Sequence, residues 1–197
     1  MEKIKNDFSL IAILLIPVSI AINIVGFQIA QMLRLPIFLD TIGTILIGLL
    51  AGPWVAAITG LLTNLINGIF NPVYLAYIPT AMVIGIAAGY LSKFKMTQGL
   101  IKMVISGIII TLVVTIVSAP ITVLVFGGAT GNTSSAITAV FLASGQQIWG
   151  AVFSSTIITE FIDKILSVVI SALIVKGMSS RYLSKFKYGN LYLKKQK

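Results

Sequence analysis

The chain alternates long apolar runs with short polar breaks. Seven apolar segments of helix length fall at 9–33, 38–51, 54–70, 73–92, 100–126, 135–158 and 160–178. None of them alternates with a period of two, which argues against a transmembrane β-barrel. The breaks carry proline, glycine or lysine, and proline and glycine typically end helices. The pattern therefore predicts an all-α integral membrane protein whose helices are joined by short loops.

Basic residues gather at three places along this pattern. Lys3 and Lys5 precede the first segment, Lys93 and Lys95 follow the fourth, and a basic tail follows the seventh. The positive-inside rule places all three regions in the cytoplasm, so the number of membrane crossings between them is even. Four segments precede Lys93, but three lie between it and the tail. One of those three segments therefore does not cross.

The segment at 135–158 is the most polar of the three, because serine, threonine and glutamine interrupt it repeatedly. We therefore predict a six-helix bundle that forms a single membrane domain over 1–197, with both termini in the cytoplasm. Residues 127–159 form an outer loop that carries a re-entrant or packed helix. The six predicted spans lie at 9–33, 38–51, 54–70, 73–92, 100–126 and 160–178.

Composition strengthens this prediction. Of the 197 residues, 57% are hydrophobic and 10% charged, whereas a soluble domain has about 45–50% apolar and about 25% charged residues. The net charge of +9 is explained by basic residues at the ends of spans, and nucleic acid is not an expected partner. Cysteine and histidine are both absent, which excludes disulfides, thiol nucleophiles and Cys/His metal sites. We expect a cell-membrane protein with no cofactor, no metal and no enzymatic activity.

The five charged residues at the predicted outer ends of the spans are Arg34, Asp40, Glu160, Asp163 and Lys164. Ionisable groups at membrane depth are costly and mark functional sites by default. The last three share one helical stripe, and Glu160 precedes Lys164 by the four residues that favour an ion pair. The stripe either serves as a structural ion pair or faces a polar ligand cavity, and both can hold together.

Amide and aromatic residues lie at the same predicted depth. They either bond neighbouring helices and line the membrane interface, or contact a flat heterocyclic ligand. Together with the charged residues they form the predicted substrate-binding set: Arg34, Asp40, Asn64, Asn67, Tyr74, Tyr77, Gln146, Gln147, Trp149, Glu160, Asp163 and Lys164.

Small residues four apart mark helix faces that allow close approach. Gly85 and Gly89 form such a pair, for which internal packing is the simplest explanation. The first predicted span carries two further pairs, and its face is the better candidate for a partner subunit. The predicted partner interface is Pro17, Ala21, Gly26 and Ala30.

Five stretches in this order resemble the substrate-binding S component of an energy-coupling-factor (ECF) vitamin transporter, most closely the riboflavin-type branch. The stretches are Leu-Pro-Ile-Phe-Leu-Asp-Thr-Ile-Gly-Thr at 35–44, Gly-Pro-Trp at 52–54, Gly-Leu-Leu-Thr-Asn-Leu-Ile at 60–66, Phe-Gly-Gly-Ala-Thr-Gly at 126–131 and Asp-Lys at 163–164. Together they extend over nearly the full chain.

The resemblance implies a mechanism. Such a protein captures a water-soluble vitamin with high affinity near the outer face, associates with a transmembrane coupling subunit and topples to release the vitamin inside. Two cytoplasmic ATPase subunits drive the cycle. The family's coupling contact is an Ala-xxx-Ala face in the first span, for which Pro17-xxx-Ala21 is the nearest match here. The glycine-rich stretch at 127–134 lacks the Gly-Lys-Ser/Thr ending of a phosphate-binding loop, so ATP energy must come from partners.

Several ligands and one other function remain open. Riboflavin, cobalamin, a pyridoxine-like ring or a pyrimidine precursor all suit a site with charges, amides and aromatic rings. The alternative is an integral-membrane sensor or scaffold module without transport, which would need no cavity. A membrane enzyme is disfavoured because no acidic motif has the spacing of a metal site.

Overall fold

The computed structural model describes residues 7–193, and within that range its regular structure is helical, without a strand. This confirms the predicted all-α class. In chain order the elements are α2 (Leu10–Met32), α3 (Ile42–Ala51), α4 (Pro53–Phe70), α5 (Val73–Ala76), α6 (Ile78–Lys93), α7 (Leu100–Phe126), α8 (Thr133–Ala143), α9 (Ile148–Gly177), α10 (Ser180–Leu183) and the 3-10 turn η1 (Gly189–Tyr192).

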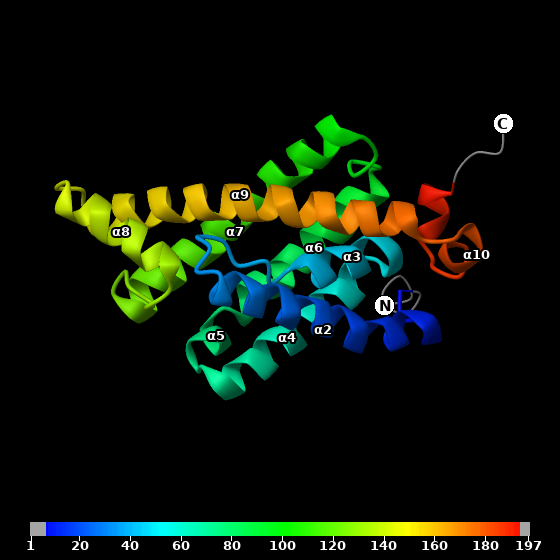
Figure 1. Cartoon of the computed structure of the whole chain (residues 1–197), viewed down its shortest axis with the longest axis horizontal. Helices are drawn as coiled ribbons and strands as arrows, with labels where there is room; N and C mark the ends of the chain where they lie inside the picture. Colours follow the sequence, from blue (N-terminus) through cyan, green and yellow to red (C-terminus); the bar gives the residue numbers. More distant parts are fainter. Residues whose placement is uncertain (1–6, 194–197) are drawn as a thin grey trace.

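The helix boundary predicted near residue 159 is wrong. Helix α9 runs without interruption from Ile148 to Gly177 and forms the longest rod of the bundle (Figure 1). No glycine or proline occurs around residue 159, so nothing ends the helix there. The break lies instead at Gly145, whose φ of 90° is available to glycine at little cost. The segment at 127–159 thus contains the short helix α8 and the first turns of α9.

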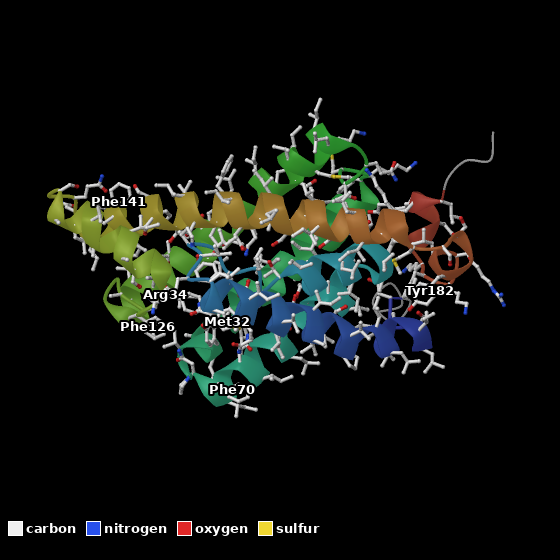
Figure 2. The ribbon with its side chains drawn as sticks, in the orientation of Figure 1. Met32, Arg34, Phe70, Phe126, Phe141 and Tyr182 are labelled. Carbon is white, nitrogen blue, oxygen red and sulfur yellow. The ribbon has the colours of Figure 1, made fainter. Side chains whose placement is uncertain are left out.

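Three helices, α2, α4 and α7, are long and apolar enough to cross a membrane by length and composition. Their outer faces carry large apolar side chains, and Met32 and Phe70 are 81% and 82% exposed (Figure 2). Such faces suit a hydrocarbon environment. Helix α9 is longer but carries Glu160, Asp163 and Lys164 near its middle.

Helix α3 is the centre of the bundle. All ten of its residues are buried, and it packs against α2, α4, α6 and α9. A helix that is apolar on every side is stable only when neighbours surround it. Close approach requires glycine at its first turn, because a Cβ on Gly43 would collide with the carbonyl oxygen of Ser19 in α2.

The Gly85–Gly89 pair packs inside the chain, as expected. A Cβ on Gly85 would collide with the backbone of Ala56, and one on Gly89 with the backbone of Pro53. These contacts let α6 lie directly against α4. The small residues therefore set the spacing of two helices within the bundle.

Asn23 joins three helices through a buried hydrogen-bond network. Its Oδ1 accepts hydrogen bonds from the backbone N–H groups of Gly43 (2.7 Å) and Thr44 (3.2 Å) at the start of α3. Its Nδ2 donates to the hydroxyls of Thr44 (2.8 Å) and Thr63 (3.0 Å). The first N–H groups of a helix have no partner within the helix, so this side chain satisfies two of them.

The tail after α9 folds back over one end of the bundle. The N–H of Tyr188 donates to the carbonyl of Leu50 at 3.0 Å, and the Tyr192 hydroxyl pairs with the hydroxyl of Ser92 at 2.8 Å. Lys187 donates to Asp7 at 2.7 Å. Burial opposes the charge of Lys187, but the hydrogen bond and negative charge of Asp7 outweigh it and raise the Lys187 pKa. The start of α2, the α3–α4 turn and the tail thus meet at one end (Figure 1).

Replacing Asn23 by leucine should lower the free energy of unfolding by about 2–3 kcal/mol, because two buried N–H groups lose their acceptor. The measurement is equilibrium unfolding of the purified protein in detergent. Gln28→Leu is the matched control, since it removes an exposed amide from the same helix and should change the stability by less than about 0.5 kcal/mol. Equal losses in the two variants would contradict the role given to Asn23.

Candidate functional site

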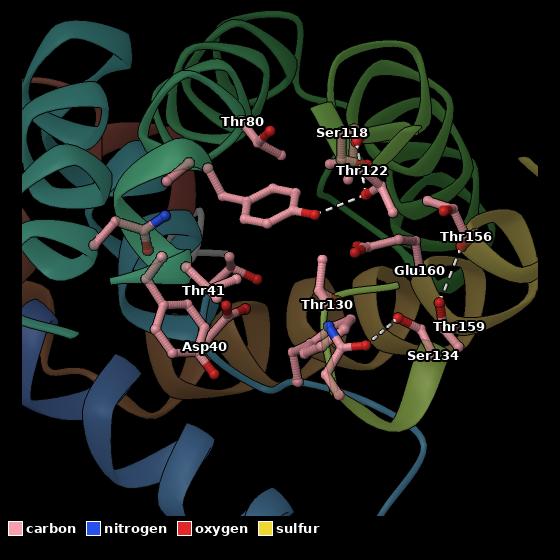
Figure 3. Close-up of a pocket in the computed structure, with 18 of the residues that line it drawn as sticks. Asp40, Thr41, Thr80, Ser118, Thr122, Thr130, Ser134, Thr156, Thr159 and Glu160 are labelled. Atoms are coloured by element: carbon pink, nitrogen blue, oxygen red, sulfur yellow. Dashed lines mark hydrogen bonds between the residues drawn. The ribbon is translucent and has the colours of Figure 1, made fainter. Parts of the chain in front are cut away.

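A polar cavity of about 170 Å³ lies at the end of the bundle away from the tail. It is bounded by the loop of residues 33–41, by α4 to α7, by α8 and by the N-terminal half of α9 (Figure 3). Hydroxyl groups dominate its wall, with a few amides and aromatic rings among them. A polar hollow within an apolar bundle is the expected form of a small-molecule site.

Half of the predicted binding residues line this cavity. They come from four different parts of the chain and include both charged and neutral groups. The six are Asp40, Asn64, Tyr74, Tyr77, Glu160 and Lys164.

The other predicted residues lie elsewhere. Arg34 is exposed on the loop after α2, and Asn67 is buried but does not line the cavity. Gln146, Gln147 and Trp149 are exposed near the α8–α9 turn. Because α9 continues through residue 159, Trp149 lies eleven residues before Glu160, about 16 Å along the helix. These three residues therefore do not line the cavity with the other predicted binding residues.

Lys164 is the centre of a buried charged cluster. Its Nζ lies 2.5 Å from Asp163 Oδ2, 3.0 Å from Glu160 Oε2 and 4.0 Å from Asp40 Oδ1. It also donates to the hydroxyl of Thr41 at 3.3 Å. Lys164 is 1% exposed and Asp163 is fully buried, so each charge depends on the other for compensation. The predicted ion pair between Glu160 and Lys164 is present, and both residues also face the cavity.

Asp163 does not line the cavity but holds the loop that covers it. Its Oδ1 accepts hydrogen bonds from the backbone N–H groups of Phe38 (3.0 Å) and Leu39 (2.7 Å). Leu39 has a φ of 53°, which is uncommon for a residue other than glycine. Gly26 in α2 lies directly beneath it, and a Cβ there would collide with the carbonyl oxygen of Leu39. The carboxylate and the glycine together fix the course of the loop.

This packing corrects part of the predicted partner interface. Pro17 and Ala21 are exposed, but Gly26 and Ala30 are buried inside the chain. Residues 17 and 26 are nine apart, which on an α-helix places them about 180° apart around the axis. The two small-residue pairs therefore lie on opposite faces of α2, and only the first remains available to a partner.

Two tyrosines give the cavity flat walls. The Tyr77 hydroxyl bonds with the hydroxyl of Thr122 at 2.7 Å (Figure 3), and its ring stacks on Phe126 with centroids 5.8 Å apart. Tyr74 meets the ring of Phe27 edge-on, at 5.3 Å. Because their neighbours hold these rings in place, the tyrosines are preorganised for a ligand.

Sequence reasoning missed most of the hydroxyl groups on the wall. Thr130 and Ser134 precede or begin α8, and Thr138 bonds to Ser155 of α9 at 2.6 Å. The serines and threonines of residues 127–159 were the reason to predict that this segment does not cross the membrane. The same polar positions, spaced three to four apart, were also the available signal for a cavity-facing side.

Within residues 7–193, no group of three or more histidine, cysteine, aspartate or glutamate residues has a geometry suited to a metal ion. The three carboxylates near Lys164 are arranged around its ammonium group instead.

Comparison with known families identifies the class of protein. The family described as "ECF transporter, substrate-specific component" matches residues 11–175, and the chain therefore belongs to this family. Its members are substrate-binding subunits of membrane transporters and not enzymes. Neither the curated proteins nor the solved structures contain a significant match to the chain. The resemblance noted in the sequence is thus confirmed at the level of the family.

Asp163→Asn should destabilise the protein in the absence of ligand by about 3 kcal/mol, because Lys164 loses its nearest counter-charge. Glu160→Gln should cost at least about 1 kcal/mol less, since Asp163 still neutralises Lys164. Equilibrium unfolding in detergent measures both values. A loss in Glu160→Gln as large as that in Asp163→Asn would contradict the division of roles between the two carboxylates.

Proposed function

We propose that the chain binds a water-soluble vitamin or vitamin precursor with high affinity and carries it across the membrane as the S component of an ECF transporter. The observation that supports this most directly is the polar cavity within an otherwise apolar bundle, lined by residues from the loop before α3 and from α4 to α9. A sensor or scaffold would not need such a space. Asp40, Asn64, Tyr74, Tyr77, Glu160 and Lys164 are the proposed ligand contacts, with Asp163 as the residue that positions the loop.

We propose six membrane-crossing segments, which contain α2, α3, α4, α6, α7 and α9, with both termini in the cytoplasm. Lys93 and Lys95 follow α6, and Lys187 lies beside Asp7 at the same end of the bundle. The positive-inside rule assigns this end to the cytoplasm. The cavity then faces outward, where a vitamin is captured. Lys3, Lys5 and the last basic residues lie outside the described range.

Energy must come from partner subunits. We propose a transmembrane coupling subunit and two cytoplasmic ATPases as partners, because the sequence carries no phosphate-binding loop. Pro17 and Ala21 form the exposed part of α2 that suits close contact with another helix. We also propose that the chain belongs to the riboflavin-type branch. The proposed ligands are riboflavin, cobalamin, a pyridoxine-like ring or a pyrimidine precursor.

The proposed function is tested by purifying the protein in mild detergent and identifying bound small molecules by mass spectrometry. We expect one vitamin-type compound in stoichiometric amount, and ATPase subunits in a parallel purification from membranes that contain the whole transporter. A broad titration panel without any binding, together with no associated ATPase, would overturn the proposal.

The proposed orientation is tested by cysteine labelling, for which the chain offers a clean background because it contains no cysteine. Gln146→Cys lies beyond the cavity and Lys185→Cys lies in the tail, and both positions are exposed. In intact cells a membrane-impermeant maleimide should label the first variant, and the second only after permeabilisation. The reverse labelling pattern would contradict the orientation.

A further inference from the structure

The carboxylates at the cavity outnumber the cations that could neutralise them. Asp40 and Glu160 line the space, and Asp163 lies directly behind it. Among the described residues that line the cavity, Lys164 is the one cationic side chain. Three carboxyl groups therefore surround one ammonium group.

Asp163 is the main counter-ion of Lys164. It is the nearest of the three carboxylates, at 2.5 Å, and it also makes a hydrogen bond with the ammonium group. Glu160 Oε2 lies 3.0 Å away but outside hydrogen-bond geometry, and Asp40 Oδ1 is at 4.0 Å. The desolvation of a carboxylate is offset only by close, well-aligned partners. Asp40 and Glu160 are consequently the two carboxyl groups without a close, well-aligned counter-charge.

Glu160 is the clearer case. It is 8% exposed, and its Oε2 lies 3.0 Å from Lys164 Nζ in the ion pair but makes no aligned hydrogen bond with a described residue. Its side chain projects into the cavity, which Asp40 faces from another side (Figure 3). A buried carboxylate oxygen whose one close partner is poorly aligned is costly. A ligand in the cavity can supply a better-aligned partner.

The remaining wall does not oppose a positive ligand. Its hydroxyl and amide groups are neutral and can turn either a donor or an acceptor toward a ligand. Phe38, Tyr74 and Tyr77 add aromatic rings, whose faces attract cations. The absence of a suitable metal-ligand group within residues 7–193 favours an organic cation over a metal ion.

We propose that the substrate of this cavity is a small organic cation, such as a protonated amine or a quaternary nitrogen heterocycle, whose positive group is held by Glu160 and Asp40. This inference rests on the proposed function as a substrate-binding subunit and narrows its substrate class. The positive charge of the ligand pairs with Asp40 and Glu160, the two carboxyl groups without a close, well-aligned counter-charge.

Matched pairs of probes test the inference by calorimetric titration of ligand-free protein in detergent. The pairs are pyridoxamine with pyridoxine, 1-methylnicotinamide with nicotinamide, and thiamine with its uncharged oxidation product thiochrome, with riboflavin as a neutral reference. In each pair that binds, we expect the cationic member to bind at least about tenfold more tightly. Glu160→Gln and, independently, Asp40→Asn should reduce this preference at least about tenfold.

Asp7→Asn is the matched control, because it makes the same carboxyl-to-amide change at the opposite end of the bundle, beside Lys187. It should leave the preference unchanged. Tight binding of riboflavin or of the neutral members, unaffected by Glu160→Gln, would overturn the cation inference and leave the proposed function standing. No binding by any probe, together with no associated ATPase, would overturn the proposed function and the inference with it.

Discussion

The arrangement of the cavity end depends on the pairing of Lys164 with Asp163. Neither charge can remain buried without the other, and Asp163 has a second oxygen that binds the backbone of Phe38 and Leu39. One ion pair on α9 thereby fixes the loop before α3. That loop in turn carries Asp40 to the cavity wall. The same pairing that neutralises a costly charge also shapes the binding site.

Much of the fold could be predicted from the sequence because its signals are local. Gly52 and Pro53 end α3 and begin α4 where expected, and the long apolar runs became helices. The boundary at residue 159 failed because polar residues were interpreted as the end of a span. In the structure Ser155 and Thr159 bond to other groups within the bundle, and the helix continues.

The site could be predicted only in part, for a similar reason. Asp40, Glu160 and Lys164 indicate a site because burying ionisable groups at membrane depth is energetically costly. Trp149 and the two neighbouring glutamines looked equally suitable, but their distance from Glu160 depends on where α9 begins. Asn23 escaped notice because a single amide within an apolar run has no visible partner in the sequence. Its partners, Gly43 and Thr63, lie twenty and forty residues further along the chain.

The unbroken length of α9 has a consequence for the depth of the cavity. Thirty residues make a helix of about 45 Å, whereas the hydrocarbon layer is about 30 Å thick. In the proposed orientation, with Lys176 at the cytoplasmic boundary, Glu160 lies sixteen residues further toward the outer side, about 24 Å along the axis. In this orientation Glu160 lies about 6 Å below the outer edge of the hydrocarbon layer, and the α8–α9 hairpin projects beyond that edge. A ligand then reaches Glu160 from the outer aqueous side without crossing the middle of the hydrocarbon layer.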